Sequence, residues 1–404
     1  MHNQVKIKKD FQMFYHHPDL VYLDNAATTL TPDIVVEAMN GYYHHYNANI
    51  HRGGHGIGAM ATERYEQVRS QVVQYIHAPG TNNIVFTSGT THGMNMLAQG
   101  LKHLLEPGDV ILLTRMEHHA NLLPWQRVVR ETGAELRFVE FTDDYQFDMD
   151  SFDRLLDERV KIVSITHISN VLGTVVPIKE VCQKAKDMQA ITIIDAAQSI
   201  AHMAVDVQDI GCDALVFSAH KMYGPTGVGV LYGTTALLEE LVPYHLGGGI
   251  VREVREDSAI WNDIPARFEA GTPNIAGVIG LGAACEYMKD MGVTDVGDHE
   301  HTLMAYAIQQ LATIPQVTML SGKTHVSSVL SFVVEGVHHH DLATLLDEEH
   351  IALRSGRHCA EPLLMALGLV GTCRISFGVY NTSEDIDRFI VALRKAIGIL
   401  TNDE

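Results

Sequence analysis

The chain has 404 residues, of which 46% are hydrophobic, so it is long enough for two or three domains with sizeable cores. A formal net charge of −20 argues against a nucleic-acid partner or an anionic membrane surface, because both bind clustered Lys and Arg. No apolar run has the length of a membrane span, and the first residues lack the apolar core of a signal peptide. The five cysteines are scattered and form no CxxC pair, which argues against a disulfide framework or a zinc ribbon and fits a cytoplasmic protein.

Strand and helix patterns alternate along the first two thirds of the chain. This alternation predicts an open, mainly parallel α/β sheet, and functional sites in such folds lie beyond the carboxyl ends of the strands. The segments that contain predicted strands are residues 83–101, 109–133, 134–140, 161–170, 190–198 and 213–217. We assign residues 22–279 to this large domain.

The pattern changes from about Gly280. Residues 286–314 and 386–400 have helical patterns, while residues 329–337 and 373–380 are typical of strands. We therefore expect a smaller α+β domain made of residues 280–404, joined by residues 1–21.

Lys221 follows the apolar run 214–217 and precedes a glycine-rich turn. Burial lowers the pKa of an ammonium group and makes the amine nucleophilic, which suits a Schiff base with an aldehyde cofactor such as pyridoxal 5'-phosphate (PLP). The alternative is a lysine at a strand end that simply reaches solvent.

Thr90 and Thr91 lie between a predicted strand and a helix, after Gly89. Free N–H groups at a helix start, with hydroxyls beside them, can bind a phosphate, although an ordinary threonine cap has the same pattern. The stretch lacks the lysine of a Walker motif and is not a Rossmann GxGxxG, so a nucleotide is not expected.

Asp195 ends a buried strand and needs a partner, which a pyridinium nitrogen would supply; Gln198 could reach the ring oxygen of the same cofactor. The alternative for Asp195 is a helix cap. His118 or its neighbour His119 could stack on a flat cofactor and transfer protons. We expect no metal site here, because no carboxylate or cysteine stands at ligand spacing beside these histidines.

Cys359 has the surroundings of a reactive thiol. Arg354, Arg357 and His358 stand close to it in the sequence, and nearby cations favour the nucleophilic thiolate. The other four cysteines are predicted to pack as small apolar residues.

These features occur together in motifs that resemble the SufS-type cysteine desulfurases, in the class V aminotransferase group of PLP enzymes. The resemblance runs from about Tyr22 to the C-terminus and implies the PLP-dependent transferase fold type I. The motifs are LDNAATT, HRGGH, SGTTHGMN, MEHHAN, ITHISNVLGT, IDAAQS, SAHKMYGPTGVG, RFEAGTPN and RSGRHCAEPL.

The resemblance also implies roles for individual residues. Lys221 would hold PLP and, with His118, move protons, while Cys359 would be the nucleophile. The ring would contact His118, Asp195 and Gln198. The phosphate would be bound by Thr90, Thr91, Ser218 and His220, joined by Thr272 of the partner subunit. The substrate would contact Asn170, Arg354 and Arg374, with His51 and Arg52 near the cleft.

The implied reaction converts L-cysteine to L-alanine and leaves a persulfide on Cys359. The family implies a homodimer and a sulfur-acceptor protein of the SufE or SufU kind that supplies an iron–sulfur scaffold. One departure is Arg357, where SufS-type sequences have a second histidine; we expect this extra cation to favour the Cys359 thiolate further.

Several alternatives stay open at this point. They are a CsdA-type desulfurase, a selenocysteine lyase, another class V enzyme such as an aminotransferase or a kynureninase-like hydrolase, and a histidine-rich metal-binding protein. Another class V enzyme would leave Cys359 unexplained. A metal-binding protein would leave Asp195 and Lys221 unexplained.

Overall fold

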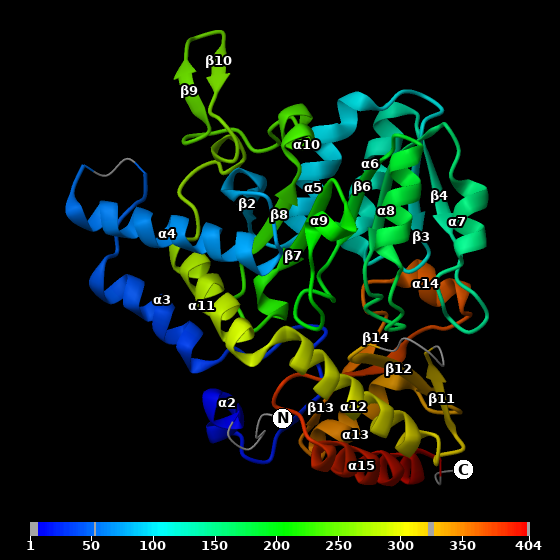
Figure 1. Cartoon of the computed structure of the whole chain (residues 1–404). Helices are drawn as coiled ribbons and strands as arrows, with labels where there is room; N and C mark the ends of the chain where they lie inside the picture. Colours follow the sequence, from blue (N-terminus) through cyan, green and yellow to red (C-terminus); the bar gives the residue numbers. More distant parts are fainter. Residues whose placement is uncertain (1–6, 52–53, 322–326, 402–404) are drawn as a thin grey trace.

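The computed structural model describes residues 7–51, 54–321 and 327–401 (Figure 1). Its centre is a seven-stranded sheet in the order β2-β8-β7-β6-β5-β3-β4. Neighbouring strands are parallel except at β8, which is antiparallel to both β2 and β7, so the prediction of a mainly parallel sheet is confirmed. The strands are β2 (Ile84–Thr87), β3 (Val110–Thr114), β4 (Glu135–Val139), β5 (Val160–Thr166), β6 (Ile191–Asp195), β7 (Ala214–Ser218) and β8 (Gly229–Gly233).

Both faces of this sheet are covered by helices. In β3, Ile111 and Leu113 belong to one buried cluster, while Val110 and Leu112 belong to another, as expected when side chains alternate along a strand. One cluster includes residues of α5 (Thr90–Leu101), α6 (Leu123–Thr132) and α10 (Thr235–Glu240). The other includes residues of α4 (Gly56–Tyr75), α7 (Met149–Leu155), α8 (Ile178–Asp187), α9 (Val207–Ile210) and α11 (Ile275–Met291).

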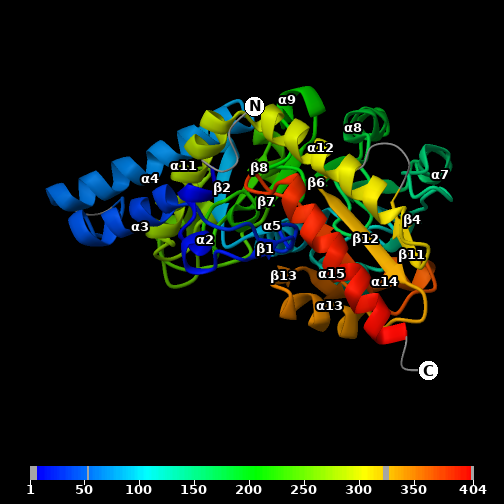
Figure 2. The same cartoon turned by 90° about the horizontal axis from the view of Figure 1, so that it is seen from below.

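The last part of the chain forms a second sheet, of four antiparallel strands in the order β11-β12-β15-β14. Seen from below, α12 and α15 run side by side under this sheet (Figure 2). The elements are α12 (Val293–Leu311), β11 (Val317–Leu320), β12 (Val329–Val334), α13 (His339–Glu348), β13 (Ile351–Ala352), β14 (Arg354–Gly356), α14 (Glu361–Ala366), β15 (Thr372–Ser376) and α15 (Ser383–Thr401).

The N-terminal segment contacts both parts of the molecule. Phe11 packs edge-on against Tyr380 with ring centroids 4.9 Å apart, and it lies in the same buried cluster as the large sheet. The short strand β1 (Val21–Tyr22) pairs in parallel with β13 of the small domain. The remaining elements are α2 (Gln12–His16), α3 (Asp33–His45) and a hairpin of β9 (Val251–Val254) and β10 (Ala259–Trp261).

The expected domain boundary at 279/280 falls inside a continuous helix. Helix α11 packs on α3 and α4, and its buried residues as far as Met291 belong to the large cluster. Gly292, with φ of +74°, separates it from α12, whose Leu303 and Met304 belong to the small core. We therefore propose that the large domain extends to the end of α11.

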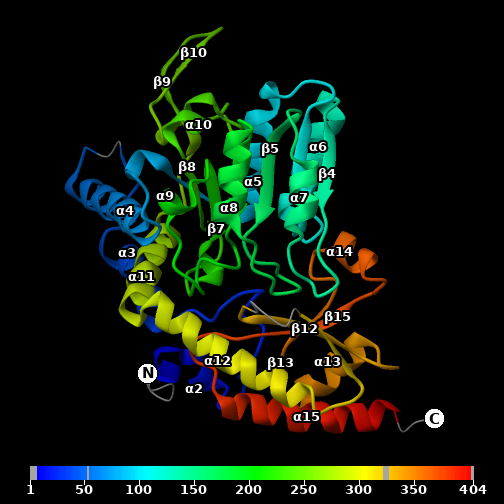
Figure 3. The same ribbon diagram turned by 45° about the vertical axis from the view of Figure 1, so that its right-hand side comes forward.

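The carboxyl ends of the parallel strands point toward the small domain, as the arrowheads in Figures 1 and 3 show. The loops that follow these strands therefore meet loops of the small domain at one place. Within the described ranges, no helix combines the length and apolar character needed to cross a membrane.

Candidate active site

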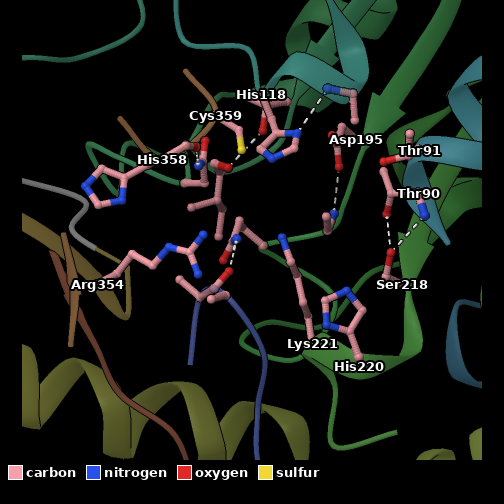
Figure 4. Close-up of a pocket in the computed structure, with 18 of the residues that line it drawn as sticks. Thr90, Thr91, His118, Asp195, Ser218, His220, Lys221, Arg354, His358 and Cys359 are labelled. Carbon is pink, nitrogen blue, oxygen red and sulfur yellow. Dashed lines mark hydrogen bonds between the residues drawn. The ribbon is translucent and has the colours of Figure 1, made fainter. Parts of the chain in front are cut away.

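A cavity of about 270 Å³ lies where the two domains meet. Of the predicted site residues that the structure describes, it brings together all except Thr272 and His51, and Figure 4 shows how the main ones face one another. The predicted residues that line it are Thr90, Thr91, His118, Asn170, Asp195, Gln198, Ser218, His220, Lys221, Arg354, Cys359 and Arg374. The sequence prediction that residues following different strands share one cleft is thus met by the geometry.

Lys221 lies in the short 3-10 turn Ala219–Lys221 that follows β7, and its side chain extends into the cavity (Figure 4). Burial lowers the pKa of its ammonium group from 10.5 to about 8, although the nearby Asp195 carboxylate acts in the opposite direction. An amine with this pKa is partly unprotonated near neutral pH and is therefore a competent nucleophile.

This pKa gives a direct prediction for cofactor-free protein. Only the unprotonated amine attacks an aldehyde, so the rate of covalent capture of PLP by Lys221 should rise with pH and reach half its maximum at about 8. Capture rates are measured by borohydride trapping and peptide mass spectrometry. A midpoint near the ordinary lysine pKa of 10.5 would contradict the assignment of Lys221 as an amine with a lowered pKa.

The start of α5 forms a cluster of donors at one end of the cavity. The Thr90 N–H donates to Ser218 Oγ at 2.8 Å, and the two hydroxyl oxygens are 2.9 Å apart. Gly89 has φ of +144°, and a Cβ on Gly229 would lie 2.5 Å from the Gly89 Cα, so this close approach requires glycine. His220 completes the cluster, and burial lowers the pKa of its ring to about 4. The cluster therefore offers neutral donors and a helix N-terminus, as a phosphate site does.

Asp195 lies at the end of β6 and is buried. Its Oδ1 accepts a hydrogen bond from the Ala197 N–H at 2.9 Å, and burial raises its pKa. Burial of the charged carboxylate costs free energy, and a cationic group bound in the cavity would lower that cost. Gln198 is held nearby by a 2.7 Å hydrogen bond from its Nε2 to the Ala26 carbonyl.

His118 is fixed as a neutral ring with a defined tautomer. Its Nδ1 accepts a hydrogen bond from the Ala120 N–H at 3.0 Å, so the ring proton is on Nε2. Burial lowers its pKa to about 3, and the positive charge of Lys221 acts in the same direction. The ring can therefore stack on a flat cofactor without carrying charge, and it can exchange a proton only through Nε2.

Sequence reasoning missed Glu117, the buried carboxyl group that holds the His118 loop in place. Glu117 accepts hydrogen bonds from the hydroxyl of Thr114 at 2.7 Å, from the N–H of Thr166 at 3.1 Å and from Asn121 Nδ2 at 2.7 Å. Burial raises its pKa to about 7. The only sequence signal is its position inside the MEHHAN motif, next to His118.

Two arginines enter the cavity from the small domain. Arg354 on β14 and Arg374 on β15 are direct partners across the two strands, so their side chains leave the same face of the sheet. The buried Arg374 donates to the Asn170 carbonyl at 2.9 Å and to Asp24 Oδ1 at 3.1 Å. Asp24, which sequence reasoning also missed, lies 3.9 Å from Arg354 as well. One carboxylate thus faces two guanidinium groups, which leaves a net positive charge for an anionic substrate group.

Cys359 is the one exposed cysteine among the five, all of which lie in described residues. Its sulfur points into the cavity beside His118 (Figure 4). Burial raises the pKa values of Cys182, Cys285 and Cys373 to about 12, so those thiols are protonated and enclosed. The prediction that they pack as apolar residues agrees with this burial.

The structure places Thr272 and His51 outside this cavity. Both line a separate hollow, where His51 Nε2 lies 2.9 Å from Glu66 Oε1 and Asn49 donates to Thr272 Oγ1 at 3.4 Å. The role of Thr272 was predicted for the phosphate of a partner subunit, so this position does not test it, and the role of His51 also stays a prediction. Arg52 lies outside the described residues.

The sequence predicted no metal site at His118 and His119, and the arrangement of possible metal ligands bears on this expectation. In the part of the chain that the structure describes, no three His, Cys, Asp or Glu side chains are placed to hold a metal ion. His338, His339 and His340 are consecutive histidines at the start of α13, where the His338 ring accepts a hydrogen bond from the His340 N–H at 3.3 Å.

Known proteins match this chain over nearly its whole length. Residues 21–389 match the family model described as aminotransferase class-V. A probable cysteine desulfurase of Vibrio cholerae is 47% identical over 382 residues, 94% of each chain. One of Halalkalibacterium halodurans is 44% identical over 397 residues, which are 97% of this chain and 98% of the relative.

Solved structures agree with the sequence matches. The cysteine desulfurase CsdA of Escherichia coli, in an S-sulfonic acid form, has a TM-score of 0.93 at 39% identity and covers 99% of both chains. An apo cysteine desulfurase of Thermococcus onnurineus has a TM-score of 0.95 at 40% identity and covers 98% of this chain and 99% of its own. The chain therefore has the PLP-dependent transferase fold type I and belongs to the cysteine desulfurases of the class-V aminotransferase family.

Proposed function

We propose that the protein is a PLP-dependent cysteine desulfurase that converts L-cysteine to L-alanine and transfers the sulfur to Cys359. The observation that carries this proposal is the position of Cys359, an exposed thiol that lines the same cavity as the Lys221 amine. An aminotransferase or a kynureninase-like hydrolase has no use for a nucleophilic thiol there.

The cavity fits PLP by the chemistry of its groups. It offers an amine with a lowered pKa, a buried carboxyl group whose pKa is raised by burial, and a cluster of hydrogen-bond donors at the start of α5. Lys221 would hold the aldehyde carbon, Asp195 the ring nitrogen and Gln198 the ring oxygen, with His118 on the ring face. Thr90, Thr91, Ser218 and His220 would hold the phosphate. When bound, PLP supplies an electron sink for the substrate's α-carbon.

The residues around this site divide the remaining work. Arg374 binds the substrate carboxylate, aided by Arg354 and Asn170. Lys221 moves the proton of the α-carbon, and His118 exchanges a proton through Nε2. The Cys359 thiolate attacks the substrate sulfur, so an S–S bond forms and the substrate C–S bond breaks. The electron pair of that bond stays with the β-carbon, which takes a proton and becomes the methyl group of L-alanine.

Arg374→Lys tests the assignment of the carboxylate site. Lysine cannot form the two-pronged contact of a guanidinium group, so we expect KM for L-cysteine to rise by about tenfold to a hundredfold. Alanine formation over a range of L-cysteine concentrations measures this change. Arg394→Lys, on the outer helix α15, is the matched control. An unchanged KM in Arg374→Lys would contradict the role.

Two further proposals concern assembly. We propose a homodimer, supported by the position of Thr272 away from its own chain's cavity, where it can serve as the phosphate ligand of a second copy. We also propose that the enzyme works in the cytoplasm and passes sulfur to an acceptor of the SufE or SufU kind, which supplies an iron–sulfur scaffold. The exposure of Cys359 supports this transfer, since a second protein can reach it.

The activity is tested by incubating the cofactor-loaded protein with L-cysteine and a reductant. We expect alanine and sulfide in equal amounts, because each turnover releases one of each. Alanine without sulfide, or pyruvate in place of alanine, would point to a different class V reaction.

A further inference from the structure

The loop that carries Cys359 has a strained backbone. His358 and Cys359 have φ values of +52° and +53°, in the left-handed region that residues with a side chain rarely adopt. Two such residues in succession persist only when contacts from outside the segment hold them. The question is therefore which contacts hold this loop.

The large domain supplies three contacts to the loop and to the turn that follows it. The His119 N–H donates to the Cys359 carbonyl at 2.8 Å. Asn170 Nδ2 donates to the His358 carbonyl at 2.8 Å. The third contact joins side chains, since His119 Nε2 lies 2.5 Å from Glu361 Oε2, two residues beyond Cys359. His119 thus contacts this segment twice, through its backbone at Cys359 and through its ring at Glu361.

Glu361 has few other partners. Its Oε2 is buried, and within the described ranges no donor meets hydrogen-bond geometry at this atom; the group that faces it is the His119 ring, whose Nε2 lies 2.5 Å away. Its Oε1 lies 3.8 Å from Arg357, on the other side of the cysteine. Arg357 and the His118 ring both lie near the contact between His119 and Glu361. The centroid of the His118 ring is 6.2 Å from that of His119. Arg357 is thus directed to Glu361.

We propose that His119 and Glu361 are positioning residues that clamp the Cys359 loop against the large domain and keep the thiol directed into the cavity. This inference rests on the proposed function, because it assigns the clamp to the sulfur-transfer step. Cys359 both lines the cavity and is exposed, so the clamp sets how much of the time the thiol faces the substrate. Arg357 and Glu361 form an ion pair that spans the cysteine.

The test compares the cofactor-loaded wild type with Glu361→Ala, His119→Ala and the double variant. Glu384→Ala, in the first turn of α15, is the matched control, because it also removes an acidic residue from the start of a helix. Alkylation by iodoacetamide reports release of the loop, since Cys359 is the exposed cysteine of the chain. Alanine formation gives kcat and KM for L-cysteine. His119→Ala leaves the sequence of the loop untouched, which keeps the test valid if a loop variant folds poorly.

For each single variant we expect alkylation to become about twofold to fivefold faster and kcat to fall by a similar factor, as for loss of a partly exposed ion pair. KM should change by less than about twofold, because the substrate's binding groups are untouched. The double variant should be no worse than the more affected single variant, because both changes remove the same contact.

The proposal is overturned if both single variants alkylate and turn over like the wild type, or if their effects add in the double variant. A parallel rise in KM would also overturn it, because it would place the pair in substrate binding. If the wild type forms no alanine, the proposed function fails, whereas the alkylation rates still decide whether the clamp exists.

Discussion

Cys359→Ala is expected to lower alanine formation from L-cysteine by at least about a thousandfold, as loss of a catalytic nucleophile does in other enzymes. The physical reason is that no other thiol can replace it. Cys182, Cys212, Cys285 and Cys373 are buried, and burial raises the pKa of each, so none offers a thiolate to the cavity. Alanine release under saturating L-cysteine measures the effect.

Cys285→Ala is the matched control for this prediction, because it removes a thiol from α11 by the same chemical change. We expect that variant to keep nearly all of its activity. If Cys359→Ala and Cys285→Ala were equally active, Cys359 would not be the nucleophile, and the enzyme would belong with class V members that need no thiol.

The second large effect is expected for Lys221→Ala. Without the amine, PLP has no covalent attachment in the cavity and the α-carbon proton has no acceptor, so turnover should fall by at least about a thousandfold. Borohydride treatment should fix the cofactor to the wild-type chain but not to the variant, as the intact-protein mass records. This readout is independent of activity.

Lys102→Ala, which removes a lysine that pairs with Glu131 outside the site, serves as the control. It should retain both the fixed cofactor and the activity. Borohydride labelling that persists in Lys221→Ala would show that another lysine holds the cofactor. It would contradict the prediction that Lys221 is the residue that binds PLP covalently.

Much of the site could be predicted because it depends on local sequence patterns. Asp195 and Lys221 each follow an apolar run, and the parallel topology places the ends of such runs at one edge of the sheet. The same argument applies to Thr90 and His118. An amine, a carboxylate and a phosphate turn at one edge are compatible with PLP, the motif resemblance implied that cofactor, and the match to the class-V aminotransferase family supports it.

The rest depends on contacts between distant residues, which the sequence pattern does not encode. Asp24 lies in the first strand region but faces Arg354 and Arg374 in the small domain, and nothing local to it indicates that pairing. The contact between His119 and Glu361 likewise joins two domains. Gly292 ends α11 well after the expected domain boundary. The sequence pattern did not indicate this position, because helical periodicity continues on both sides of it.

Arg357 illustrates the same limit. The sequence placed this cation next to Cys359 and suggested that it acts on the thiol. In the structure its guanidinium group lies 3.8 Å from Glu361, so its charge is partly neutralised by a carboxylate four residues ahead. An effect of Arg357 on the thiol therefore stays a prediction, and it should depend on Glu361.

The most direct test of the central claim is peptide mass spectrometry after brief exposure of the cofactor-loaded enzyme to L-cysteine without reductant. We expect the peptide that contains Cys359 to gain the mass of one sulfur atom, in an amount equal to the alanine released in the first turnover. Addition of a reductant should remove that sulfur. Alanine released with no added sulfur on Cys359, or with sulfur on a different cysteine, would contradict the account.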